Sequence, residues 1–156
     1  MRTVAETLGL AWCPLFYRDI LFHVAMVAGV GFWTGLWLAV PVQPITPDQL
    51  LSPVFFSLVL WQPILEEFLF RGCLQGQLRQ PAWGQRQWCG VTVANGLTSL
   101  LFAAGHGWHH APLWAAAVLW PSLLFGYFRD RYGSVYPCMV LHAFYNAGYF
   151  ALTGLP

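Results

Sequence analysis

The chain has 156 residues, of which 58% are hydrophobic and only 8% are charged, against about 25% charged in a typical soluble domain. Its basic and acidic residues nearly balance, with a net charge of +1, which excludes intrinsic disorder and a nucleic-acid-binding surface. A soluble domain of this length needs more polar surface than these residues supply. The composition therefore predicts a membrane protein that has the lipid bilayer as its solvent and binds no nucleic acid.

Five stretches approach the length of about 20 apolar residues that a membrane-spanning helix needs. They are residues 20–40, 50–70, 88–106, 111–128 and 133–152. Residues 1–19 are interrupted by Glu6 and Pro14, so we expect an interfacial helix there and no cleavable signal peptide. Because no linker or repeat separates these stretches, we predict one all-α domain over residues 1–156. It is a polytopic transmembrane bundle of about five spans, with a motif-bearing core at about 50–153.

The placement of arginine predicts the orientation of this bundle. With five spans, every arginine falls on the same side of the membrane: Arg2, Arg18, Arg71, Arg79, Arg86, Arg129 and Arg131. The loops on the other side, at residues 41–49 and 107–111, contain none. The positive-inside rule therefore predicts a cytoplasmic N-terminus and a C-terminus outside.

Ionisable side chains inside a membrane are costly, so each is by default a candidate for a functional site. The first cluster, residues 66–71, reads Glu-Glu-Phe-Leu-Phe-Arg. Glu67 and Arg71 have the helical spacing of an ion pair with the acid first, whereas Glu66 points about 100° away from Glu67. A structural ion pair accounts for Glu67 and Arg71 but leaves Glu66 unexplained.

The second predicted span carries a proline and a polar tail that affect this cluster. Pro63 lacks a backbone N–H, so we expect a kink near Val59. If the helix continues to about Arg79, a turn there returns the chain to the level of Glu66 near His106. Glu66 and His106 then lie at the same depth.

Two further clusters lie in the later spans. Phe102 and His106 are four residues apart in the third span, and His142 and Asn146 are four apart in the fifth, which places each pair on one helix face. A lone histidine in an apolar helix is more often a packing residue than a catalyst. Two histidines with an asparagine in register and a carboxylate predict a polar site inside the bundle.

The three clusters, Glu-Glu-x-x-x-Arg, Phe-x-x-x-His and His-x-x-x-Asn in that order, resemble the CAAX protease and bacteriocin-processing (CPBP) family of glutamic intramembrane proteases. The resemblance runs from about Pro63 to Phe150. It implies that Glu66 and His106 activate a water for attack on a scissile carbonyl. By the same resemblance His142 and Asn146 stabilise the oxyanion, while Glu67, Arg71 and Phe102 support the site.

General chemistry is consistent with these implied roles. A desolvated carboxylate has a raised pKa and becomes a competent general base near neutral pH. An asparagine N–H suits a developing oxyanion, each such donor contributing roughly 3–4 kcal/mol. We therefore expect neither a metal nor an organic cofactor. Two histidines and a glutamate also suit zinc with an open water position, and that alternative stays open.

The resemblance further implies a bacterial inner-membrane enzyme whose partners are the lipid bilayer and a membrane-anchored protein substrate. It is similar to the processing enzymes paired with C-terminal sorting signals, of which the JDVT-CTERM type is our hypothesis. The sequence does not predict the oligomeric state.

Two alternatives from other classes remain. Cys138 and His142 share a helix face, as in a cysteine-type sorting protease, although that interpretation leaves Glu66 and His106 unused. A non-enzymatic membrane immunity or scaffold protein would instead tolerate the loss of Glu66 and His106.

Overall fold

The computed structural model describes residues 3–39, 41–108 and 111–156. Arg2, which entered the orientation argument, and Val40, the predicted end of the first span, lie outside these ranges. Contacts divide the chain into two compact units, one of residues 1–13 and 66–138 and the other of residues 14–65 and 139–156. Each unit is described by itself, and the single domain stays a prediction.

The structure is mostly helical, which confirms the all-α class. Within the described residues, two helices are long and apolar enough to cross a membrane by length and composition: α2 (Ile20–Ala39) and the helix Pro53–Leu78. The five-span count is therefore not confirmed. The helices α7 (Val93–His106) and α9 (Leu119–Tyr132) have 14 residues each, short of the roughly 20 that a perpendicular span needs.

The helix Pro53–Leu78 is longer than the second predicted span, residues 50–70. It continues through the polar tail, towards the turn near Arg79 that the sequence analysis considered. It consists of α4 (Pro53–Phe56), the π-helical η2 (Ser57–Trp61), α5 (Gln62–Glu67), the π-helical η3 (Phe68–Gln75) and α6 (Gly76–Leu78). Near Val59, where we expect a kink, the helix is π-helical, in the segment η2. π-Helical turns within α-helices are rare and frequently accompany functional sites.

The third predicted span begins later than residue 88. The antiparallel strands β1 (Gln87–Trp88) and β2 (Val91–Thr92) form a hairpin instead. Its two turn residues, Cys89 and Gly90, both have positive φ, as a tight two-residue hairpin requires. The Thr92 hydroxyl then accepts a hydrogen bond from the Asn95 N–H and caps α7, so the helix begins at Val93.

The fourth predicted span is two helices. The short α8 (Pro112–Ala117) and α9 are separated at Val118. Beyond residue 128, α9 continues to Tyr132, where Gly133 adopts a left-handed φ of 63° that ends the helix. The last helix, α10, is Tyr136–Thr153 rather than residues 133–152.

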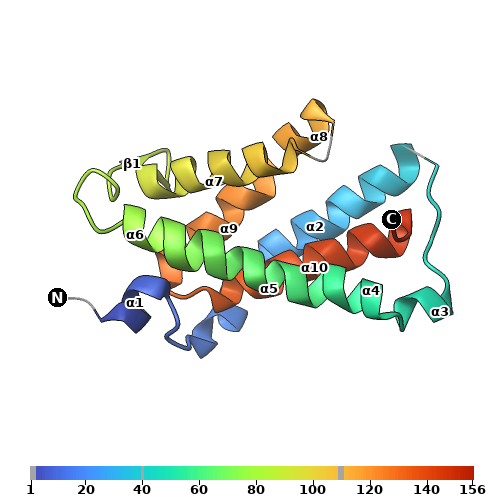
Figure 1. Cartoon of the computed structure of the whole chain (residues 1–156), viewed down its shortest axis with the longest axis horizontal. Helices are drawn as coiled ribbons and strands as arrows, with labels where there is room; N and C mark the ends of the chain where they lie inside the picture. The colour runs from blue at the N-terminus through green and yellow to red at the C-terminus, as the bar shows by residue number, and fades with distance from the viewer. Residues whose placement is uncertain (1–2, 40, 109–110) are drawn as a thin grey trace. The chain divides into compact units, whose positions relative to one another are not determined.

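Three helices pack together in the first unit. α7 lies against both α9 and η3 (Figure 1), and the buried faces carry polar side chains. Asn95 donates from its amide to the Leu123 carbonyl at 2.9 Å, and Gln75 donates to the Gly126 carbonyl at 2.9 Å. A Cβ at Gly126 would collide with the Asn95 amide, so glycine permits this close approach.

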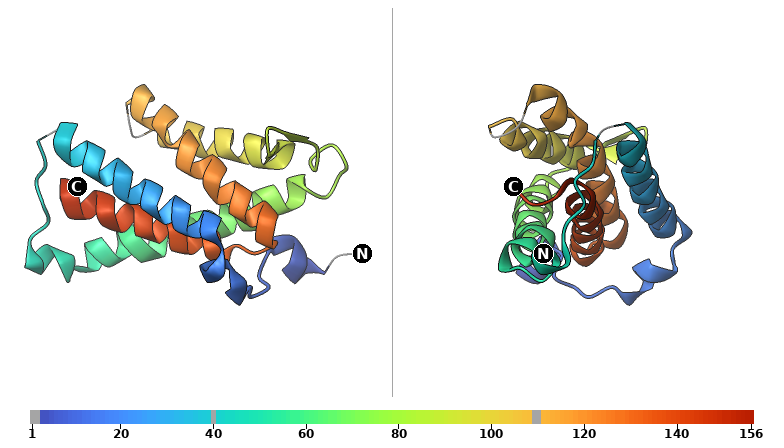
Figure 2. Two further views of the ribbon diagram at one scale, coloured as in Figure 1. Left: turned by 180° about the vertical axis from the view of Figure 1, so that it is seen from behind. Right: turned by 90° about the vertical axis from the view of Figure 1, so that its right-hand side faces the viewer.

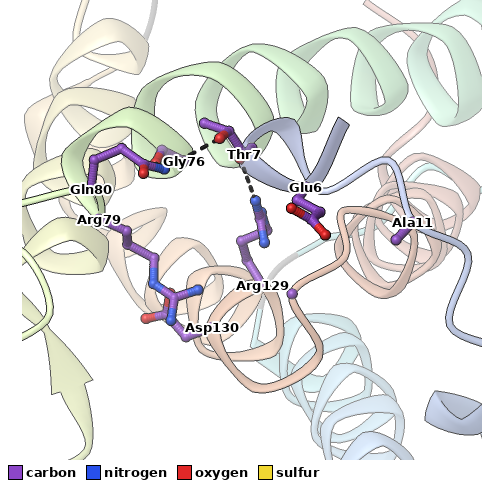
Figure 3. A pocket seen from close by; sticks show the side chains of 9 residues that line it. Glu6, Thr7, Ala11, Gly76, Arg79, Gln80, Arg129 and Asp130 are labelled. Carbon is purple, nitrogen blue, oxygen red and sulfur yellow. Dashed lines mark hydrogen bonds and ion pairs between the residues drawn. The ribbon is translucent and has the colours of Figure 1, made fainter. Parts of the chain in front are cut away.

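The N-terminal segment is held against the same unit by its backbone. α1 (Val4–Leu8) begins with a capping box between Thr3 and Glu6. A Cβ at Gly76 would collide with the Thr7 carbonyl, and Arg129 donates to that same carbonyl at 2.7 Å (Figure 3). A short N-terminal helix is therefore present, and η3 and α6 pack against it; its interfacial location stays a prediction.

Aromatic and small residues pack α2 against α10 in the second unit (Figure 2). The Tyr145 hydroxyl donates to the Ala25 carbonyl at 2.7 Å, and the rings of Trp33 and Phe144 have centroids 4.6 Å apart. A Cβ at Gly148 would collide with the Trp33 ring. The loop before the short α3 (Pro47–Leu50) joins this packing through a hydrogen bond from the Ile45 N–H to the Ala151 carbonyl at 3.0 Å.

Candidate active site

The predicted ion pair between Glu67 and Arg71 is present and completely buried. Arg71 Nε donates to Glu67 Oε2 at 3.0 Å, and both side chains are 0% exposed. Burying two charges costs several kcal/mol per ion, and only close pairing with further hydrogen bonds compensates for that cost. This ion pair therefore needs additional polar partners around it.

Ser122 on α9 is one of these partners. Arg71 Nη2 donates to its hydroxyl oxygen at 2.7 Å, which ties η3 to α9 at the level of the ion pair. The motifs did not identify Ser122. The signal that points to it is a serine within the apolar stretch 119–128, because such residues commonly form interhelical hydrogen bonds in membrane proteins.

The Phe102 ring lies between the charged pair and His106. The guanidinium carbon of Arg71 is 5.4 Å from the Phe102 ring centroid, within the range of a cation–π contact. The Phe102 and His106 rings have centroids 4.6 Å apart, and Phe70 packs edge-on against Phe102 at 4.9 Å. The first two sequence clusters thus meet around a single buried phenylalanine.

A hydrogen bond within α7 orients the His106 imidazole. Its Nδ1 lies 2.9 Å from the Phe102 carbonyl oxygen, which can only accept, so Nδ1 carries the proton. In the neutral ring the lone pair is then on Nε2. His106 is half-buried, and this tautomer suits a group that accepts a proton or orients a water.

Glu66 differs from its neighbour in burial. It is half-buried in α5, next to the fully buried Glu67. Glu66 and His106, each half-buried, belong to the same compact unit as the buried ion pair of Glu67 and Arg71. The environments of the two glutamates are therefore unequal, as their helical positions predict.

His142 and Asn146 belong to the second compact unit. His142 is buried, with 7% of its surface exposed. Asn146 donates from its side-chain amide to the Leu58 carbonyl at 2.9 Å, a contact with a backbone group that the sequence motifs did not predict.

Cys138 lies in a packing position. Its thiol is 0% exposed and donates to the Phe125 carbonyl, with the sulfur 3.1 Å from the oxygen. A nucleophilic cysteine needs thiolate character and access, and this environment offers no access. The geometry thus disfavours the cysteine-type alternative.

A second polar cluster lies away from these residues, around Asp130. The Asp130 carboxylate accepts hydrogen bonds from Thr92 at 2.6 Å and from Gln75 at 2.8 Å, and Arg79 Nε lies 3.1 Å from it. Nearby, a cavity of about 330 Å³ is lined by residues of α1, α6 and α9 and of the segments that follow them (Figure 3). Its charges balance, since Glu6 and Asp130 accompany Arg79 and Arg129. We interpret this cluster as a structural tie between helices.

In the part of the chain that the structure describes, no group of three or more His, Cys, Asp or Glu side chains is arranged to hold a metal ion. The zinc alternative therefore gains no support from the described geometry.

Comparison with known proteins identifies the family. The model of the family described as "Type II CAAX prenyl endopeptidase Rce1-like" matches residues 48–148, more than half of the chain. This range includes all three sequence clusters. A search of curated proteins and a search of solved structures each found no match.

The chain therefore belongs to the Rce1-like, or CPBP, family of membrane proteases. That membership confirms the resemblance seen in the motifs. It also supports a membrane-embedded peptide hydrolase.

Proposed function

We propose that the chain is a glutamic-type intramembrane endopeptidase that hydrolyses a peptide bond in or near the membrane segment of an anchored protein. One observation carries the proposal: the Phe102 ring joins the Arg71 guanidinium to His106. The Glu-Glu-x-x-x-Arg and Phe-x-x-x-His motifs therefore form one cluster within a compact unit. Family membership supports the reaction class.

In this mechanism Glu66 is the general base. Its carboxylate takes a proton from a water molecule that His106 Nε2 orients, and the water oxygen attacks the scissile carbonyl carbon. The proton then passes to the departing amine nitrogen as the C–N bond breaks. General acid–base catalysis of this kind contributes about 10²–10⁴-fold.

The remaining motif residues have distinct roles in the proposal. N–H groups of His142 and Asn146 donate to the oxyanion of the tetrahedral intermediate, a role that the family motif supports. Glu67 and Arg71 do not react with the substrate. Their buried ion pair, tied to Ser122, holds η3 and thereby the position of Glu66.

We expect hydrolysis to be independent of metal, because a carboxylate and an imidazole suffice to activate water. Cleavage by the purified chain should keep its rate in EDTA and in 1,10-phenanthroline. Loss of activity in both chelators, with recovery on adding zinc, would contradict this mechanism and favour Glu66 as a zinc ligand.

The substrate class is tested in the natural host. We propose a membrane-anchored protein with a C-terminal sorting signal, of the kind that JDVT-CTERM processing enzymes cleave. Mass spectrometry of the C-terminal peptides of membrane proteins should show truncation in cells with the wild-type chain only. Cells without the chain, or with Glu66→Gln, should retain the intact termini. If the C-termini of membrane proteins are identical in all three kinds of cell, the proposed activity is refuted.

We propose a bacterial inner-membrane location with the N-terminus in the cytoplasm, on the basis of the arginine distribution. An alkaline phosphatase fusion after Asp48 should then be active, because this loop would lie outside. A fusion after Arg86 should be inactive, since Arg79 and Arg86 mark a cytoplasmic loop. An inactive fusion after Asp48 with an active fusion after Arg86 would show the opposite orientation, with the N-terminus outside.

A further inference from the structure

Three fully buried side chains of the first unit each have a polar atom without a hydrogen-bond partner among the described residues. The atoms are Arg71 Nη1, Gln75 Oε1 and Thr98 Oγ1, and all three residues are 0% exposed. Buried polar groups in native proteins are nearly always bonded, either to protein or to an ordered water. Three such atoms in one packed interface therefore indicate a bound ligand.

Neighbouring hydrogen bonds fix how two of these atoms are presented. Gln75 Nε2 donates to the Gly126 carbonyl at 2.9 Å and to the Asp130 carboxylate at 2.8 Å. Both partners are acceptors, so the amide has only one possible orientation, and Oε1 needs a donor. Arg71 uses Nε in the buried ion pair and Nη2 for Ser122, which leaves the two N–H groups of Nη1.

The Thr98 hydroxyl is not bonded to its own helix. A helical threonine often donates to the carbonyl four residues back, as Thr34 and Thr153 do here, each at 2.9 Å. Thr98 lies in the middle of α7, yet in the described part of the chain its hydroxyl has no such bond. This hydroxyl is therefore available to a partner outside α7.

The packing of α7 against η3 brings the three side chains to one level. α7 runs back alongside η3 in the opposite direction (Figure 1), and the Arg71 guanidinium carbon is 5.4 Å from the Phe102 ring centroid. One turn back from Phe102 in α7 therefore corresponds to one turn forward from Arg71 in η3. Those two positions are Thr98 and Gln75.

We propose that one water molecule binds between η3 and α7 and joins these three atoms. It accepts a hydrogen bond from Arg71 Nη1 and donates to Gln75 Oε1 and Thr98 Oγ1. Buried waters typically make about three hydrogen bonds of this kind. The ligand is neutral, because Glu67 already balances the charge of Arg71 and the Gln75 oxygen would repel an anion.

This water connects two polar clusters of the unit. Gln75 also donates to Asp130, so the water extends the Asp130 cluster to the buried ion pair. It is distinct from the hydrolytic water, since the Phe102 ring lies between Arg71 and His106. The inference goes beyond the proposed function and does not depend on it.

An experimental structure of the purified full chain, at a resolution that shows ordered waters, tests the proposal. The wild-type chain should have a density peak about 2.7–3.2 Å from each of the three atoms. Thr98→Ser keeps the hydroxyl and should keep the peak, whereas Thr98→Val has the same shape without the hydroxyl and should lose it. Direct bonds among the three side chains, or a peak that fits a chloride ion instead, would overturn the proposal.

Hydroxyl-radical footprinting with X-rays is the second measurement, because radicals formed from a bound water oxidise the nearest side chains even where bulk water has no access. Phe102, which is 2% exposed, should be oxidised in wild type and in Thr98→Ser, and this oxidation should be lost in Thr98→Val. Phe128 is the matched control, since it is 0% exposed and should stay unmodified in all three.

Two footprinting results would contradict the proposed water. One is a Phe102 as unreactive as Phe128 in the wild-type chain. The other is equal oxidation of Phe102 in wild type and Thr98→Val, which would assign the reactive water to the His106 side of the ring. Neither measurement uses a substrate, so a wild-type chain that cleaves nothing would refute the proposed function and leave this test unaffected.

Discussion

Glu66→Gln should abolish peptide hydrolysis while the melting temperature stays within about 1–2 °C of wild type. Glutamine has nearly the shape of glutamate and keeps its hydrogen-bonding reach, but its amide cannot accept a proton from water. The loss should be about 10²–10⁴-fold or more. It is measured as cleavage of the identified substrate, with the melting temperature taken in the same detergent.

His106→Ala should reduce cleavage similarly, because it removes the imidazole that orients the water. The substitution should have a modest effect on stability, since the ring is half-buried and packs at a tilt against Phe102. Glu6→Gln is the matched control: it removes a carboxylate outside the motifs, and glutamine also fits a capping box. If Glu66→Gln cleaves at a near wild-type rate, the glutamic-type assignment is wrong.

The second large effect concerns stability. Glu67→Ala and Arg71→Ala should each lower the free energy of unfolding by roughly 3–5 kcal/mol, because each leaves one buried charge without its partner. Both side chains are 0% exposed, so water does not compensate. Thermal unfolding in detergent should show this loss, and cleavage should fall with it.

The double variant Glu67→Leu/Arg71→Leu should be more stable than either single alanine variant, because it leaves no unpaired charge. Arg18→Ala is the control, since Arg18 is exposed and lies over the Tyr17 ring. Single alanine variants as stable as the Arg18 control would show that the ion pair does not support the fold.

Local features of the helices were predictable from the sequence. The spacing of Glu67 and Arg71 predicted their ion pair, because residues four apart share a helix face wherever the helix is packed. Pro63 predicted a kink near Val59 for a similarly local reason, and the helix is π-helical there, in η2. The ordered motifs predicted the family, which the match over residues 48–148 confirms.

Other predicted helix boundaries were wrong because local turn and capping residues, which hydrophobicity does not detect, set where the helices begin and end. The apolar composition around Trp88 predicted a helix, but Cys89 and Gly90 form a tight turn and Thr92 caps the helix that follows. The apolar stretch 111–128 is likewise broken at Val118. Hydropathy predicts which segments avoid water, but it does not predict where a helix begins.

The sequence by itself therefore determined the membrane environment, the protease family and the contacts within single helices. Only the tertiary structure decided which groups on different helices meet: Ser122 with Arg71, and Asn146 with the Leu58 carbonyl. The physical reason is the separation of the partners along the sequence. Helical spacing constrains neighbours one turn apart, whereas partners 51 and 88 residues apart meet through helix packing, which depends on side-chain shape and on every buried polar group finding a partner.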